Sequence, residues 1–245
     1  MSRYFLEVAY KGTNYNGFQI QQNANTIQAE VEKSLQTLFK QNFDLTGSSR
    51  TDAGVHALQN FFHFDTDIVI TAKHIYNLNA IIPNDIIVKK ITQVADDKHC
   101  RFAAESREYK YHIYTSKNPF LEDRAYYFPY KLDVDLLHQA AAILLTYTDF
   151  TSFSKKHTQV NNFNCNIFIS RWIEENDCLV FNVKSNRFLR GMVRALVATM
   201  LKVGRGQITI EQFKNIIESK DCASAFFDTP AHGLFLVKVD YEKEQ

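Results

Sequence analysis

The stretch that decides the fold is SRTDAGVHA at residues 49–57, where small, polar and charged residues separate two apolar runs that favour β-structure. Asp52 stands at its centre. Gly54 follows two residues later and adopts backbone angles that other residues resist, so a tight turn is expected here. Arg50 lies two residues before Asp52, and an arginine that close can hold a carboxylate ionised or bind a phosphate through its planar set of donors. The structural alternative is an Asx turn before a strand, with Arg50 a solvated neighbour.

On both sides of this stretch the apolar residues follow regular periods. Residues 4–10 alternate as in a half-buried strand, and residues 27–40 carry apolar side chains at helical spacing behind Thr26 as a candidate cap. Residues 58–64 are rich in aromatics and indicate a strand. A short helix at 71–80 and a strand near 86–91 complete a first half that alternates strands with helices.

The second half repeats this mixture without a recognisable sequence repeat. Strands are expected at 107–115 and 234–241, and as a hairpin at 167–174 and 179–185. Helices are expected at 133–147, from Met192 to Gly204, and after Thr209, which forms a capping box with Gln212. Antiparallel hairpins with helices on one face favour an α+β fold over a doubly wound parallel sheet.

Length and composition limit the class of protein. The 245 residues suit one large or two modest domains, and the 28 basic against 27 acidic side chains leave a formal charge of only +1. This balance argues against indiscriminate binding to polyanions, although a local basic face stays open. No signal peptide is visible in the sequence and no apolar run approaches the ~20 residues that a membrane span needs, so we expect a cytoplasmic protein.

The cysteines and histidines give little support for a metal site. The four cysteines are widely spread without a C-x-x-C pair, and the eight histidines lack an H-x-x-x-H pattern. We therefore expect reduced, mostly structural thiols and no bound metal.

Two further groups of side chains stand out. Arg107, Tyr109 and Tyr111 share one face of the strand at 107–115, where they either stack on a planar ligand or lie under another layer of the protein. Arg187 and Arg190 precede the helix that begins at Met192, and they either contact phosphates or form a solvated helix end. Together with Asp52, these groups supply the carboxylate, aromatic rings and guanidinium groups that suit an enzyme acting on a flipped base.

The string RTDAGVHA at 50–57 resembles the signature of the TruA-type tRNA pseudouridine synthases. Any one of the further matches is weak, but they follow in the family's order along nearly the whole chain, and the distant MVR at 192–194 makes the combination strong. With x for a position that is not part of the match, these matches are YxGTxYxGFQ at 10–19, TIQ at 26–28, RF at 101–102, RxYxY at 107–111, FLxxMVR at 188–194, VGxG at 203–206 and GLxL at 233–236.

The resemblance implies an isomerase that converts uridines at positions 38, 39 and 40, in the anticodon stem-loop of tRNA, to pseudouridine by base flipping. It implies two tandem α/β-sandwich (RRM/ferredoxin-like) halves, 1–105 and 106–245, whose antiparallel sheets join side by side around a central cleft. It also implies a homodimer, with tRNA as partner and with no metal or small-molecule cofactor.

The same resemblance gives roles to individual residues. Asp52 matches the catalytic aspartate, and Arg194 matches its basic partner. Tyr109 matches the tyrosine that stacks on the target uracil, and Arg50 matches a residue at the flipped nucleotide. Whether the carboxylate attacks the ribose, attacks the base or takes a proton is left open by the sequence.

Two other classes of function remain as alternatives. A noncatalytic RNA-binding module would keep the scaffold and a basic face. A small-molecule enzyme using Asp52 for acid–base work is disfavoured, because no cofactor loop or second catalytic carboxylate can be placed nearby.

Overall fold

The computed structural model describes residues 1–156, 160 and 162–242. It divides the chain into two compact units, which we call the first and the second unit. The first unit comprises Met1–Glu105 together with the C-terminal residues from Phe235, and the second is Ser106–Leu234. The sequence-based boundary also falls after residue 105, but it assigns the terminal strand to the other half. Both units combine strands with helices, which confirms an α+β protein.

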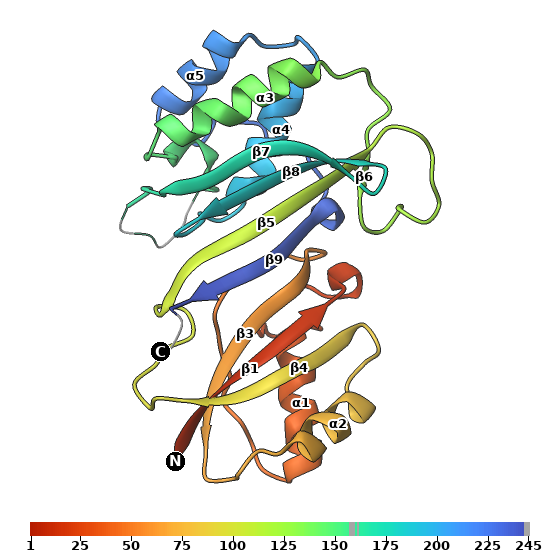
Figure 1. Cartoon of the computed structure of the whole chain (residues 1–245), viewed down its shortest axis with the longest axis vertical. Coiled ribbons are helices and arrows are strands. Elements are labelled where there is room, and N and C mark those ends of the chain that lie inside the picture. The colour runs from red at the N-terminus through yellow and green to blue at the C-terminus, as the bar shows by residue number, and fades with distance from the viewer. Residues whose placement is uncertain (157–159, 161, 243–245) are drawn as a thin grey trace. The chain divides into compact units, whose positions relative to one another are not determined.

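In the first unit, four strands form a sheet in the order β4 (Ile86–Val94), β1 (Ser2–Tyr10), β3 (His56–Thr66) and β9 (Leu234–Tyr241) (Figure 1). β1 is antiparallel to both β4 and β3, whereas β9 joins β3 in parallel. The short β2 (Thr46–Gly47) pairs with the other part of β3. The strands predicted around Asp52 are therefore present.

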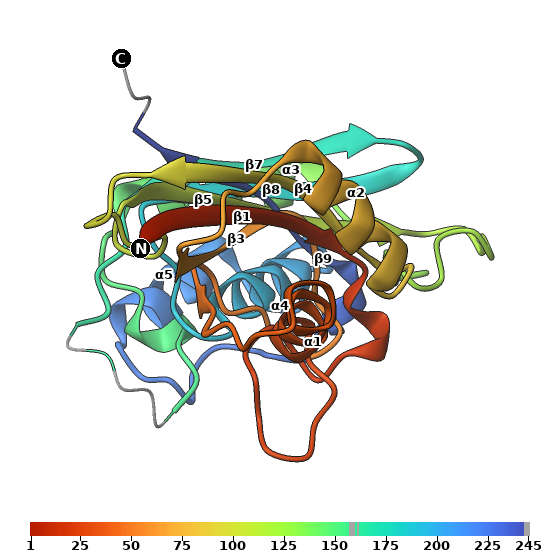
Figure 2. The ribbon, with the colours of Figure 1, turned by 90° about the horizontal axis from the view of Figure 1, so that it is seen from below.

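The helices of the first unit are α1 (Ile27–Phe39) and α2 (Ala72–Ile81), with a 3-10 turn, η1 (Gly12–Asn14). Thr26 caps α1 as expected, because its hydroxyl accepts the Ala29 N–H at 3.2 Å. Figure 2 shows α1 lying along one face of the sheet. Its apolar stripe is buried there, as the sequence spacing predicts, through Ile27, Val31 and Leu35.

In the second unit, the strand order is β5 (Ala104–Tyr114), β8 (Cys178–Ser185) and β7 (Ile167–Glu175), with the short β6 (Tyr126–Tyr127) parallel to β5. The β7–β8 hairpin turns at Asn176–Asp177, whose φ angles of 51° and 60° are the positive pair that a type I′ turn requires. The predicted hairpin is confirmed.

Three helices accompany this sheet, α3 (Val134–Ile143), α4 (Met192–Gly204) and α5 (Ile210–Glu218). Nearly every residue of α4 is buried, and α3 packs against both α4 and β7. The predicted capping box is present, with the Gln212 N–H donating to Thr209 Oγ1 at 3.1 Å. The short 3-10 helices of this unit are η2 (Leu144–Thr146), η3 (Thr151–Phe153) and η4 (Ala231–Gly233).

The described residues contain no helix that is both long and apolar enough to span a bilayer.

Candidate active site

Asp52 lies in a tight turn directly before β3. The Val55 N–H donates to the Asp52 carbonyl at 3.2 Å, and Gly54 between them has a φ of 77°. A positive φ at the third residue is what a type II turn needs, and glycine adopts it without steric cost. The Asp52 side chain is partly exposed. The turn predicted from the sequence is confirmed, and its aspartate is partly exposed rather than buried.

Thr51 anchors the turn on its N-terminal side. Its hydroxyl lies 2.8 Å from the Tyr10 hydroxyl, and its carbonyl accepts the Phe18 N–H at 3.1 Å. Thr51 is buried, so both hydrogen bonds form away from competing water. The backbone that carries Asp52 is thereby tied to β1 and to the loop that follows β1.

The backbone of that loop, residues 12–17, packs directly against the backbone of the turn. A Cβ added to Gly12 would lie 2.0 Å from the Val55 carbonyl oxygen, and one added to Gly17 would lie 3.0 Å from the Thr51 oxygen. The Gly54 N–H donates to the Tyr15 carbonyl at 3.3 Å. These two glycines therefore allow the chain to approach the turn more closely than a side chain would permit.

Further buried hydrogen bonds connect β3 with the segments on both sides of the turn. Asn60 on β3 is fully buried, and its amide donates to the Ser49 carbonyl at 2.8 Å and to the Tyr10 hydroxyl at 3.2 Å. His56 accepts the Gly12 N–H on Nδ1 at 3.0 Å. Sequence reasoning gave no role to Asn60 or His56. The family match over residues 10–19 was the signal that these segments belong together.

Arg50 is exposed at the edge of the same segment. Its position leaves the guanidinium accessible to an anionic ligand, although exposure alone is equally compatible with a solvated side chain.

In the second unit, Arg194 is the third residue of α4. Its Nε and Nη2 both donate to the Thr229 carbonyl, at 2.9 Å and 2.5 Å, and the Thr229 hydroxyl donates back to the Arg194 carbonyl at 2.9 Å. Thr229 is buried, so this reciprocal contact fixes the direction of the guanidinium. A cation in the first turn opposes the helix dipole, which makes stabilisation of α4 a poor explanation for Arg194.

Arg194 lines a cavity of about 990 Å³ in the second unit. Burial, followed by the charge of Asp228, raises the pKa of Tyr126 in its wall, which keeps that phenol protonated as a hydrogen-bond donor. The cavity combines aromatic, cationic and carbonyl groups with the carboxylates of Glu122 and Asp228, and it is large enough for a nucleotide. Besides Arg194, its lining includes Tyr114, Lys117, Asn118, Tyr126, Tyr127, Thr229, Pro230 and His232.

The two tyrosines of β5 have different surroundings. Tyr109 is 8% exposed, and its ring meets Phe188 edge-on at 5.0 Å. Tyr111 is fully buried and donates its hydroxyl to the Pro230 carbonyl at 2.8 Å, while burial raises its pKa. Tyr111 thus supports the segment that forms the cavity wall beside Arg194. Its direct contact with a substrate stays a prediction.

The two other arginines predicted for the site, Arg187 and Arg190, have different contacts from those of Arg194. Arg187 donates to the Asn162 side chain at 3.3 Å, and Arg190 is exposed, with its carbonyl accepting the Lys155 N–H at 3.0 Å. Both could contact phosphates from these positions. Because Asp52 belongs to the first unit, and Tyr109 and Arg194 to the second, the joint action of the three stays a prediction.

Comparison with known proteins identifies the class first: the chain is a pseudouridine synthase, an isomerase that acts on uridine in RNA. A family model described as tRNA pseudouridine synthase matches residues 7–103 and 140–242. The chain therefore belongs to the tRNA pseudouridine synthase family, as the motif at 50–57 predicted.

Individual relatives match along the full length. "tRNA pseudouridine synthase A" of Parabacteroides distasonis is 45% identical over 249 residues, covering 100% of this chain and 98% of the relative. Proteins of the same name from Bacteroides thetaiotaomicron and Staphylococcus aureus are 43% and 37% identical, covering 100% and 99% of this chain and 92% and 93% of the relatives.

Proposed function

We propose that this enzyme converts uridines 38, 39 and 40 in the anticodon stem-loop of tRNA to pseudouridine, with Asp52 as the catalytic nucleophile or base on a flipped uridine. Family membership supports tRNA as the substrate. The observation that carries the role of Asp52 is its turn, which combines a partly exposed carboxylate with a backbone held by buried contacts. A reacting group must be held within a fraction of an ångström, and the buried contacts of this turn support such a role for Asp52.

The reaction is an exchange of bonds within one nucleotide. The bond between N1 of uracil and C1′ of ribose breaks, the detached base turns, and C5 bonds to C1′. The hydrogen on C5 leaves as a proton, and N1 takes up a proton, so the product is an isomer of the substrate. An ionised Asp52 can attack as a nucleophile or accept the C5 proton, and both uses need the charged carboxylate.

The other site residues would bind the nucleotide. Arg194 would act as the basic partner of Asp52, Tyr109 would stack on the uracil, and Arg50 would contact the flipped nucleotide. Arg187 and Arg190 would contact phosphates, which positions RNA without reading its sequence. Tyr111 would contribute to substrate binding mainly by holding the cavity wall in position.

The arrangement that the family resemblance implies belongs to the same proposal. The two units would form tandem α/β-sandwich halves, joined sheet to sheet around an RNA-binding cleft, and the enzyme would work as a homodimer in the cytoplasm, where its substrate is found. Light scattering after size exclusion checks the dimer: a monomer mass at working concentration contradicts it.

Release of tritium from tRNA labelled at uridine C5 tests the chemistry, because rejoining the ring at C5 must expel that hydrogen. The intact protein should release tritium, whereas Asp52→Ala and the nearly isosteric Asp52→Asn should release none while still binding tRNA. Asp135→Asn, at an exposed position on α3, is the matched control and should react normally. Sequencing of the product for pseudouridine identifies the positions modified.

The outcomes separate the proposal from its alternative. Turnover by Asp52→Asn would remove Asp52 from the chemistry. Binding of tRNA without any release by the intact protein would favour a noncatalytic RNA-binding module.

A further inference from the structure

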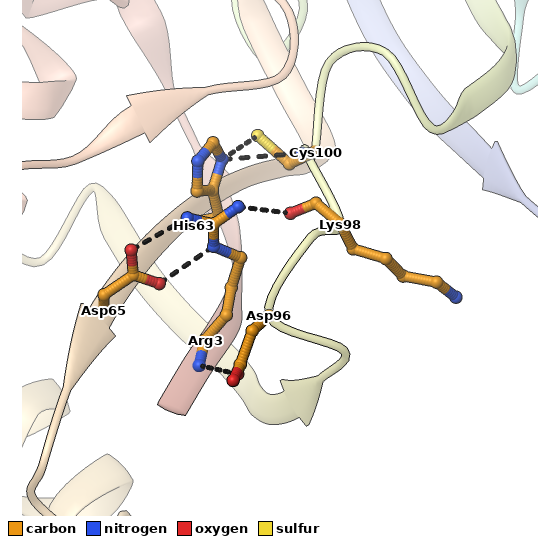
Figure 3. Close-up of polar contacts among 6 residues, drawn as sticks. All are labelled: Arg3, His63, Asp65, Asp96, Lys98 and Cys100. Carbon is orange, nitrogen blue, oxygen red and sulfur yellow. Dashed lines mark hydrogen bonds and ion pairs between the residues drawn. The ribbon is translucent and has the colours of Figure 1, made fainter. Parts of the chain in front are cut away.

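A cluster of metal-binding side chains lies in the first unit outside the proposed active site. His63 is on β3, and its Nδ1 lies 3.2 Å from the Sγ of Cys100 (Figure 3). The ring of His99 meets the His63 ring at 4.6 Å between centroids. One ligand-capable atom from each of these three residues lies within 4.8 Å of the other two. Sequence spacing gave no sign of this cluster, because His63 is distant in the chain from His99 and Cys100.

The donor set and spacing suit a zinc-type ion. Two imidazole nitrogens and a thiolate are the ligands that Zn²⁺ prefers, and a tetrahedral ion holds N and S about 3.5 Å apart. The observed 3.2 Å between His63 Nδ1 and Cys100 Sγ is close to that value. Three protein ligands leave a fourth position for water. Cys100 and His63 are buried, while His99 is partly exposed and gives access to solvent.

Charged side chains of both signs lie near the cluster, and Arg101 is a cation close to His99. The nearby Arg3 carries a positive charge, but its Nε and Nη2 are each 2.8 Å from an Asp65 oxygen, which offsets that charge (Figure 3). The charges of Asp65 and Asp44 also favour a cation at His63.

Several hydrogen bonds already involve the cluster, including the one between His63 Nδ1 and Cys100 Sγ. The Cys100 thiol donates to the Thr46 carbonyl at 3.2 Å, and its backbone N–H reaches His63 Nδ1 at 3.4 Å. The Arg101 N–H donates to His99 Nδ1 at 3.1 Å. An ion bound through these nitrogens would replace the two N–H contacts, and the thiol would release its proton to solvent as the metal–sulfur bond forms.

We propose that His63, His99 and Cys100 form a binding site for a zinc-type divalent cation. The ion would join β3 to the segment that precedes β5. Its role would be structural, and it would take no part in the formation of pseudouridine.

Cobalt(II) is the probe, because a thiolate ligand gives it a charge-transfer absorption that zinc lacks. Reduced, metal-free protein titrated with Co²⁺ should develop this absorption, saturate at an equimolar ratio and lose it when Zn²⁺ is added. Cys100→Ser should abolish the absorption. Cys222→Ser is the matched control, since Cys222 is partly exposed and outside the cluster, and it should behave as the unmodified protein.

Because Cys100 is buried and its substitution can disturb folding, a second variant tests metal binding at a partly exposed ligand. His99→Asn changes a partly exposed residue, and it should fold but bind Co²⁺ at least about 100-fold more weakly. The midpoint of thermal unfolding should rise with Zn²⁺ in the unmodified protein and not in His99→Asn. Absence of the charge-transfer band, its survival in Cys100→Ser, or saturation only at large metal excess, which marks an adventitious ion only, would overturn the site.

Discussion

The Asp52 turn and the Arg194 region hold their functional side chains in different ways. The turn is fixed through its backbone: Tyr10 and Phe18 bind Thr51, and Gly12 comes so close to Val55 that no side chain fits between them. The Arg194 guanidinium is instead held through its side chain, whose Nε and Nη2 donate to the Thr229 carbonyl beside an open cavity. The difference would suit the two proposed roles, because a reacting acid needs one position, whereas a surface for RNA must admit a large substrate.

Gly12→Ala should give the largest effect, because it tests how closely the backbone of Gly12 approaches the turn at Val55. The added methyl would lie 2.0 Å from a backbone oxygen, so either the loop or the turn must move. We expect a loss of more than about 3 kcal/mol in the free energy of unfolding, measured with urea, and a fall in tritium release.

Gly206→Ala is the control for Gly12→Ala. Gly206 has a φ of 67° and no atom within 4 Å of an added Cβ, so its cost should be only the conformational strain of about 1 kcal/mol. Equal costs for the two variants would show that the turn is less tightly enclosed than the distances indicate.

Arg194→Lys tests the pair of hydrogen bonds that the guanidinium donates to the Thr229 carbonyl. A lysine keeps the charge but presents a single ammonium in place of the two N–H groups that bind the Thr229 carbonyl. We expect kcat for tritium release to fall about 100-fold, similar to the loss of one preorganised donor in other enzymes, with a smaller change in KM. Arg205→Lys, whose guanidinium lies over the Tyr130 ring at 4.1 Å, should leave kcat unchanged. Full turnover by Arg194→Lys would mean that charge alone suffices there.

Mild acid should weaken the unit that carries the turn. The pKa of His63 on β3 is lowered from 6.5 to about 4, chiefly by burial, so below pH 6.5 the unfolded chain binds a proton that the folded chain does not. This contribution to stability is complete above pH 6.5 and is lost as the pH falls toward 4. Between pH 7 and pH 5 we expect the urea unfolding free energy to drop by about 1 to 2 kcal/mol on account of His63.

His63→Gln should remove that part of the pH dependence, and His138→Gln, at an exposed position, should not. Identical pH profiles for His63→Gln and the unmodified protein would assign the acid sensitivity to other groups. Zn²⁺ should be absent from these measurements, because an ion at His63 would compete with the proton.

Local signals in the sequence were sufficient to predict most elements. The period of two in β1, the cap at Thr26 and the capping box at Thr209 depend on residues that are near one another in the chain, and each is confirmed. One helix was predicted too long: α3 ends at Ile143, and the chain tightens into η2 through Thr146. Helix ends depend on tertiary contacts and local capping that the apolar period does not show.

What the sequence could not show are contacts between distant segments. The pairing of β9 with β3, the Tyr10–Thr51 hydrogen bond and the approach of His63 to Cys100 all join residues that no local period relates. Tyr111 illustrates the same limit, because its alternation with Tyr109 places both on one face of β5 but does not distinguish their surroundings. The roles of Asp52, Arg194 and Tyr109 came from the family motif rather than from physical pattern.

The smallest expected effects concern these two tyrosines and sharpen the comparison within the second unit. Tyr111→Phe removes the buried hydrogen bond to the Pro230 carbonyl, so the free energy of unfolding should fall by about 1 kcal/mol, while tRNA binding falls only slightly. Tyr109→Phe keeps the ring that would stack on uracil, so it should retain most RNA affinity and stability while changing turnover. Unfolding, tRNA binding and tritium release measured on both variants separate the roles. If Tyr109→Phe turns over normally, the hydroxyl is unimportant and only the ring can contribute. If Tyr111→Phe instead loses turnover at full stability, Tyr111 acts on the substrate itself, and the cavity wall beside Arg194 does not depend on it for support.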